Sequence, residues 1–318
     1  MSLLDKTNLL ITPNAFKASK LYSVIPSSGT GDLTAVRNTT ATRVNSSGFI
    51  ESIAANVPRL NYVNVGGNPS ILVEPQTTNL ALYSSDFNNA AFAKDSTVLS
   101  NNTTSPANDL TGSKITERTN TGRQGLFQTL GSLAQSNYSF SLFAKESTNR
   151  YVVINISDVS GANYFQSVFD LNNGTITQEN LNGSAVKISS KSTSLLNGWY
   201  RIEIIVNVIP KYLTISLSRV PTFIPGSFGY NNYAGNGTGN IFIWGMQFEN
   251  RTTTTSYIPT TSAAVTRNED IITVAPPVGT VKITTTFSDN TTQVLITIPA
   301  TFTVPEGLIK QVLMQSSL

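Results

Sequence analysis

The sequence predicts an all-β protein whose central part is a sandwich or barrel. Two observations predict it. Apolar and aromatic residues alternate with polar ones at a period of two in several segments, which is the side-chain period of a half-buried strand. Turn residues separate these segments at intervals of roughly 8–15 residues, a spacing typical of sandwiches and barrels. Helical spacing is confined to two short segments, residues 54–57 and 308–313.

The central strands follow in chain order, and each has its own signal. They are predicted at residues 138–144, 150–157, 164–171, 199–209, 212–220 and 241–248. Asn172-Asn173-Gly174 after the third segment is a strong hairpin-turn signal. Trp199 and Trp244 lie inside alternating segments, so both are predicted to be core residues.

Three regions emerge along the chain. Residues 1–80 are irregular, strand-poor and interrupted by proline, residues 81–270 carry the dense alternating segments, and residues 271–318 form a small C-terminal β-hairpin region. Its hairpin is predicted from residues 281–287 and 292–298, around a turn at Ser288-Asp289-Asn290. Both end regions are too small to offset their ordering entropy alone. We therefore expect them to lean on the sandwich or on neighbouring copies in a homo-oligomer.

Composition excludes much chemistry. The 318 residues include no Cys and no His, 21 Lys and Arg, and 18 Asp and Glu, for a net charge of +3. Disulfides, zinc thiolates and imidazole bases are therefore excluded. Ser, Thr and Asn number 36, 41 and 32. The basic residues are scattered, so no nucleic-acid partner is expected. No apolar run reaches the length of a membrane span, and the start does not resemble a secretory signal, so no membrane association is expected.

A series of short sequence segments, spread over most of the chain, resembles segments of a known protein family. The segments are Thr40-Ala41-Thr42-Arg43-Val44-Asn45, Gly48-Phe49-Ile50-Glu51, Asn56-Val57-Pro58-Arg59-Leu60-Asn61-Tyr62, Pro69 to Leu80, Gly198-Trp199-Tyr200-Arg201, Ile241 to Glu249, Thr255-Ser256-Tyr257-Ile258-Pro259-Thr260 and Ala264-Val265-Thr266-Arg267. In this order they resemble fibre or spike proteins of tailed-phage virions. The opening, Leu10 to Lys17 and Leu21 to Pro26, is similar to proteins of Bacteroidetes-infecting phages, including crAss-like phages.

The resemblance implies a central jelly roll similar to carbohydrate-binding modules. It also implies a location on the virion surface, where residues 1–80 would serve attachment or oligomerisation. The expected function is that of a non-enzymatic head fibre or spike. We expect it to self-associate as a trimer and to have other capsid or tail proteins as partners. The first alternative is a tail-associated receptor-binding protein for host surface polysaccharide, and the second is a glycan-degrading enzyme. Thr77 and Asn250-Arg251 depart from the family pattern.

Sparse charges stand out against the neutral background. Arg43, Arg59 and Arg267 are sparse cations in this background, and Glu51 and Glu74 are equally sparse anions. Arginine–carboxylate pairs would lock a chain that wraps a surface, or a subunit interface. Solvated surface charges are the equally weighted alternative.

A glycan-binding tip is predicted in residues 228–237, which hold two Tyr, three Asn and three Gly. Tyr230 and Tyr233 would stack on the apolar face of a sugar, and Asn231 and Asn232 would bind its hydroxyls. The alternative, which we weight more heavily, is a loop whose tyrosines pack on the domain.

An enzyme would need two carboxylates in one cleft. Asp158 with Asp170, and Glu203 with Glu249, are the candidate pairs. Carboxylates at strand ends more often cap turns, so no catalytic residue is predicted. No cofactor is expected, and a structural Ca²⁺ in the sandwich stays open.

Overall fold

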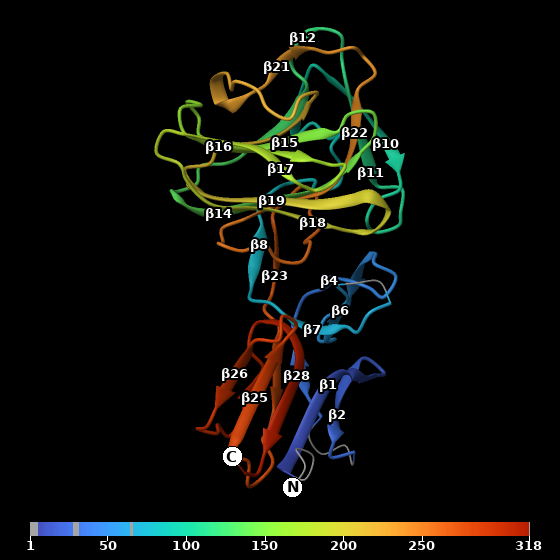
Figure 1. Cartoon of the computed structure of the whole chain (residues 1–318), viewed down its shortest axis with the longest axis vertical. Coiled ribbons are helices and arrows are strands. Elements are labelled where there is room, and N and C mark those ends of the chain that lie inside the picture. The colour runs from blue at the N-terminus through green and yellow to red at the C-terminus, as the bar shows by residue number, and fades with distance from the viewer. Residues whose placement is uncertain (1–5, 28–31, 64–65, 318) are drawn as a thin grey trace. The chain divides into compact units, whose positions relative to one another are not determined.

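A computed structural model describes residues 6–27, 32–63 and 66–317. Its regular structure is almost entirely β-strand (Figure 1), so the predicted fold class is confirmed. The chain forms two compact units, one of Thr78–Thr266 and one that combines Met1–Thr77 with Arg267–Leu318. We call them the central unit and the terminal unit.

The central unit is a β-sandwich of two six-stranded sheets with jelly-roll-like strand order. The β14 sheet contains, in spatial order, β10 (Thr97–Thr103), β11 (Gly112–Glu117), β22 (Asn240–Glu249), β14 (Ser136–Glu146), β19 (Trp199–Val208) and β18 (Val186–Ser194). The β15 sheet contains β17 (Ile176–Asn182), β16 (Tyr164–Asp170), β15 (Tyr151–Ser157), β20 (Tyr212–Ser218), β13 (Gly125–Thr129) and β9 (Phe92–Asp95). Neighbouring strands in both sheets are antiparallel. A separate pair is formed by β12 (Thr121–Arg123) and β21 (Asn232–Ala234).

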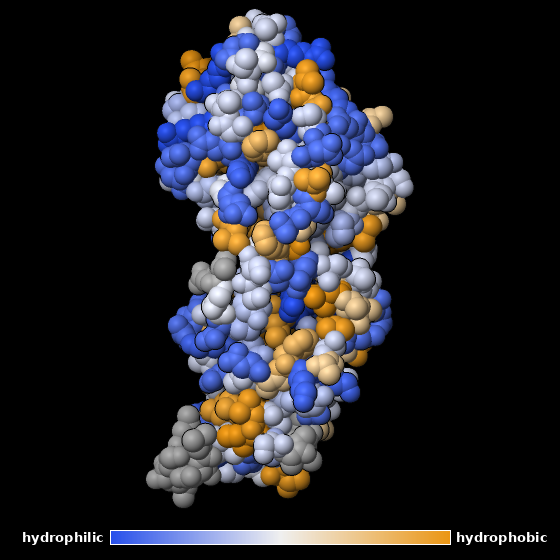
Figure 2. Space-filling view, turned by 90° about the vertical axis from the view of Figure 1, so that its right-hand side faces the viewer, coloured by the Kyte–Doolittle hydropathy of each residue, from blue (hydrophilic) through white to orange (hydrophobic). Residues whose placement is uncertain are grey.

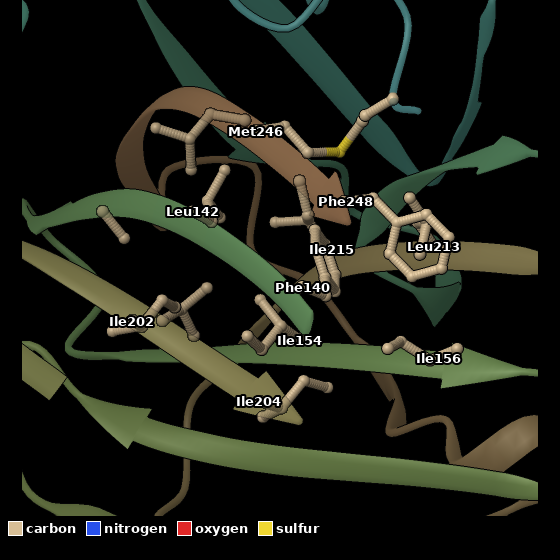
Figure 3. Packing of buried hydrophobic residues seen from close by; sticks show 14 of the residues in the cluster. Phe140, Leu142, Ile154, Ile156, Ile202, Ile204, Leu213, Ile215, Met246 and Phe248 are labelled. Atoms are coloured by element: carbon tan, nitrogen blue, oxygen red, sulfur yellow. The ribbon is translucent and has the colours of Figure 1, made fainter. Parts of the chain in front are cut away.

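The core of the central unit lies between its two sheets. Because side chains alternate along a strand, every second residue points inward, and most of the inward residues are apolar. Figure 3 shows these side chains meeting from both sheets: Phe140 and Leu142 from β14, Ile154 and Ile156 from β15, Ile202 and Ile204 from β19, Leu213 and Ile215 from β20, and Met246 and Phe248 from β22. Trp199 and Trp244 are both buried, as the sequence predicts.

The terminal unit joins the two ends of the chain in one sheet. Its strand order is β2 (Lys20–Ile25), β1 (Thr7–Lys17), β28 (Gly307–Gln315), β25 (Lys282–Phe287) and β26 (Thr292–Leu295), and β28 also pairs with β7 (Ser70–Val73), which pairs with β6 (Arg59–Asn61). Smaller sheets consist of β3 (Thr34–Val36), β24 (Ile271–Val274) and β27 (Phe302–Thr303), and of β4 (Ala41–Val44) and β5 (Ile50–Ile53). A further pair, β8 (Thr77–Asn79) and β23 (Val265–Arg267), contains the two boundaries between the units, after Thr77 and after Thr266.

Several details differ from the sequence-based expectations. The predicted hairpin is present as β25 and β26, but the first 80 residues contain far more strand than their pattern indicates. The two end regions, expected to be separate, form one unit because β28 pairs with both β1 and β7. The boundaries fall after Thr77 and Thr266 rather than after residues 80 and 270.

The prediction of two short helical segments was wrong. Residues 308–313 belong to strand β28, and residues 54–57 form a turn after β5. Six residues are too few for the spacing of apolar positions to separate helix from strand, so the neighbouring strands decide. Here β1, β7 and β25 offer hydrogen bonds to both edges of β28.

Candidate functional sites

Three of the predicted charged residues meet in one buried network of the terminal unit. Arg59, at the start of β6, is fully buried, and its Nη1 lies 2.8 Å from Glu74 Oε2. Arg267 Nη2 lies 3.4 Å from the same carboxylate oxygen. Burial of both guanidinium groups excludes the alternative of solvated surface charges for these two residues.

Two members of this network, Arg37 and Asp270, were missed in the sequence. Asp270 binds Arg37 Nη1 through Oδ1 at 2.8 Å and Arg59 Nη2 through Oδ2, and it also faces Arg267. Three cations therefore share two carboxylates. The only available signal in the sequence was the sparseness of charged residues, which holds equally for the residues that were chosen.

Main-chain carbonyls complete the surroundings of the arginines. Arg37 donates to the carbonyl oxygens of Ala54 and Val57, and Arg59 donates to that of Thr42. The carboxylates of Glu74 and Asp270 more than offset burial, so the pKa of Arg59 is raised. Such a cluster fastens chain segments that are far apart in sequence.

Arg43 and Glu51 form a second, separate pair on the β4–β5 hairpin. Arg43 Nη2 lies 2.7 Å from Glu51 Oε1, and Arg43 Nη1 also donates to the carbonyl of Leu60. Both side chains keep partial exposure. The pair ties the hairpin to β6 and lies apart from the buried network.

Tyr230 and Tyr233 pack on the central unit. Tyr230 stacks on Phe228 with a centroid distance of 5.4 Å, and the guanidinium carbon of Arg123 lies 4.0 Å from its ring centroid. Tyr233 donates its hydroxyl to Glu117 Oε2 at 2.9 Å. Their neighbour Asn231 donates to Ser218, whereas Asn232 is exposed. The two rings therefore stabilise the segment in this conformation.

Glu117 is the centre of these contacts. Its carboxylate accepts hydrogen bonds from Arg219 Nε, at 3.1 Å to Oε1 and 3.2 Å to Oε2. It also accepts from the hydroxyl of Tyr233 and from the main-chain N–H of Asn236. Burial opposes the charge of Glu117, but these hydrogen bonds outweigh it and lower its pKa. Burial and the neighbouring carboxylate raise the pKa of Tyr233. This arrangement holds a loop in place and keeps both groups in their neutral-pH charge states.

A second polar network closes the central unit. Asn79 donates to the carbonyls of Met246 and Ile258 at 3.2 and 2.8 Å and accepts from the N–H of Phe248 at 2.9 Å. Gln247 Oε1 accepts from Ile258 N at 2.6 Å, and Tyr257 pairs with Ser84 at 2.6 Å. The network joins both ends of this unit to β22.

The candidate catalytic carboxylates are separated in space. Asp170 pairs in register with Tyr151 at one end of β15, and Asp158 follows Ser157 at the other end, so about 20 Å of strand lies between them. Asp158 accepts from Ser160 and Asn163, and Asp170 binds Arg150 Nε at 2.6 Å.

Glu203 and Glu249 lie on opposite sides of β14, with register partners Ser141 and Ser139. Glu203 binds Thr254 and Lys191, and Glu249 binds Gln247 and Thr255. Each carboxylate therefore has its own structural partners, and the two do not share a register position.

Among residues 6–27, 32–63 and 66–317, no group of three or more acidic residues could hold a metal ion. In the same ranges, no helix is long and apolar enough to cross a bilayer. On the face drawn in Figure 2, apolar residues form small separate groups among polar ones.

Comparisons with solved structures include a distant likeness to a xylanase. No protein-family model and no curated protein matches the chain. A solved structure of the N-terminal CBM22-1–GH10 modules of Clostridium thermocellum xylanase 10B, with xylohexaose, aligns with 10% identity and a TM-score of 0.30. The alignment covers 59% of this chain and 30% of that one. At this TM-score the likeness carries no functional weight, and the fold class rests on the chain's own strands.

Proposed function

We propose that this protein is a structural component of a bacteriophage virion, a head fibre or spike that self-associates as a trimer. Its sandwich would project from the particle surface, and other capsid or tail proteins would be its partners. The proposal is based on the sequence segments that resemble, in the same order, those of tailed-phage surface proteins. The fold alone suits many functions, so these segments and not the fold carry the proposed role.

One observation gives the proposal physical support. The segments that carry the resemblance are far apart in sequence, yet several of their polar residues meet in two buried networks. Arg59, Glu74 and Arg267 meet in the terminal unit, and Asn79, Gln247 and Tyr257 meet around β22 in the central unit. Buried polar contacts are weakly screened by salt, which suits a passive part of an extracellular particle.

Immunogold labelling of purified particles tests the proposal. Antibodies against the central unit should label the head surface, and mass spectrometry of the same particles should find the chain. Light scattering of the purified protein should give three times the mass of one chain. Absence of the chain from particles would refute the structural role, and a monomer would refute self-association.

A tail-associated receptor-binding protein is the second candidate. The observation that favours it is the aromatic and amide-rich segment around Tyr230, Asn231, Asn232 and Tyr233, which covers one face of the β15 sheet. Gold label on the tail, with binding to host polysaccharide, would select this candidate. The enzyme alternative has less support because Asp158 and Asp170 lie at opposite ends of a hairpin.

A further inference from the structure

A row of polar side chains crosses the outward face of the β15 sheet. Asn180 on β17, Gln166 on β16, Asn155 on β15 and Thr214 on β20 are register partners on four adjacent strands. The inward neighbours of Asn155, which are Ile154 and Ile156, belong to the core. Alternation therefore places the row on the opposite face.

Three of the four row residues are buried although they face away from the core, and the fourth, Asn180, is partly buried. Gln166 is 0% exposed, and Asn155 and Thr214 are each 1% exposed. Within the described residues, five atoms of the row have no hydrogen-bond partner: Gln166 Nε2 and Oε1, Asn155 Oδ1, Thr214 Oγ1 and Asn180 Nδ2. Buried polar groups are almost always paired, so adjacent unpaired groups on four strands require an explanation.

Residues 219–234, which we call the strap, cover this face (Figure 1). Gln178 on β17 holds the main chain of Phe223 with two hydrogen bonds, at 2.7 and 2.8 Å, and Thr177 donates to the carbonyl of Pro221. Asn155 Nδ2 donates to the carbonyl of Phe228 at 3.1 Å. Side chains of the sheet thus fasten a strap whose first part lacks regular strand pairing.

Aromatic rings border the row. Phe127 on β13 is the register partner of Thr214, and it contacts Tyr212, which contacts Phe228. The guanidinium of Arg123 lies between the rings of Phe127 and Tyr230, at 4.7 and 4.0 Å from their centroids. Aromatic faces beside polar groups offer both apolar and hydrogen-bonding contacts to one ligand.

We propose that this row is a binding site for a neutral polyol, such as a sugar unit of a glycan, that enters when the strap lifts. The unpaired atoms include donors and acceptors, and each sugar hydroxyl can serve both. Carboxylates are absent from the four row positions, so the row does not match a cation. Beside the row, Arg123 Nη2 pairs with Asp95 at 3.3 Å, whereas the buried Nε and Nη1 of Arg123 have no partner among the described residues and can donate to further hydroxyls of the same ligand.

This inference deepens the second candidate function and is independent of where the chain sits on a particle. It places the ligand beneath the strap, against Gln166, Asn155 and Thr214. The predicted tip residues Tyr230 and Tyr233 then hold the cover instead of forming the principal contact surface. Apparent affinity should be reduced by the fraction of molecules in which the strap is closed.

Titration calorimetry with the full chain tests the proposal. The probes are neutral hexoses, pentoses and their short oligomers. Gln166→Leu should weaken binding at least about tenfold, because the amide contacts are lost, while raising the melting temperature. Thr214→Val, which keeps the side-chain shape, should weaken binding without unfolding the sandwich. Ser167→Ala, on the inward face of the same strand, is the matched control and should leave binding unchanged.

A variant that loosens the strap should change the apparent affinity in the opposite direction. Gln178→Ala removes two hydrogen bonds that hold the strap, so it should increase apparent affinity and association rate. If neither the wild type nor this variant binds any probe, the site is refuted. Binding that is insensitive to both Gln166→Leu and Thr214→Val would also refute it, since the ligand would then sit elsewhere. Neither outcome bears on immunogold labelling, so the virion role is tested separately.

Discussion

Asp270 Oδ1 accepts a hydrogen bond from Arg37 Nη1 at 2.8 Å, although 233 positions separate the two residues in the sequence. Arg59 and Arg267 contact the same carboxylate. A single side chain in the C-terminal segment thus binds three arginines, two of which belong to the N-terminal segment. The terminal unit is held together by this contact as well as by the pairing of β1 with β28.

Replacing Asp270 with Asn should strongly destabilise the terminal unit. The substitution keeps the shape but leaves three buried guanidinium groups with Glu74 as their only anion among the network residues. Breaking a buried ion pair costs about 3–5 kcal/mol. Chemical denaturation should report that loss, whereas Glu51→Gln in the partly exposed Arg43 pair should cost about 1 kcal/mol or less. Equal costs for the two variants would contradict this account.

Tyr257 should make the protein lose stability in alkali. Burial raises the pKa of Tyr257 from 10.0 to about 12. The folded state therefore keeps the phenol proton after the unfolded state has lost it. The contribution of this group is fully present below pH 10 and is lost as pH rises towards 12, at up to about 1.4 kcal/mol per pH unit. The difference in unfolding free energy between wild type and Tyr257→Phe should change with pH in that window and stay constant from pH 7 to 9.

Glu117 should contribute to acid sensitivity of the central unit. Its hydrogen bonds hold its pKa below the ordinary 4.5, in spite of burial. A lowered folded pKa gives stability that is present above 4.5 and lost as pH falls through the folded value. Glu117→Gln removes this titration, so the stability difference between wild type and variant should shrink as the medium is acidified. A difference that is the same at pH 7 and pH 3 would show that the charge of Glu117 does not stabilise the loop.

Removing residues 307–318 should unfold the terminal unit and leave the central unit intact. The deletion takes away β28, which pairs with β1, β7 and β25 and contributes Ile309, Val312 and Met314 to the core. Differential scanning calorimetry should lose the transition of the terminal unit and keep that of residues 78–266. Lys310→Ala, an exposed change in the same strand, should shift stability by no more than about 0.5 kcal/mol. Loss of both transitions would mean that the central unit does not fold independently.

Local pattern was enough to predict much of the central unit. The alternation in residues 138–144, 150–157 and 212–220 predicted strands that are present as β14, β15 and β20. The turn at Ser288-Asp289-Asn290 predicted the β25–β26 hairpin. Such features follow from a side-chain period of two and from the backbone preferences of a few turn residues, which act within a short stretch of chain.

Other features depended on the tertiary structure. Nothing local pairs Arg37 with Asp270, β1 with β28, or Asn155 with the carbonyl of Phe228 in the strap. The sequence by itself determined an all-β protein without cysteine or histidine chemistry, rich in small polar side chains. Only the folded chain decided which charges were buried and which polar atoms lost their partners. The physical reason is that hydrogen bonds and burial depend on distance in space, whereas sequence patterns record only distance along the chain.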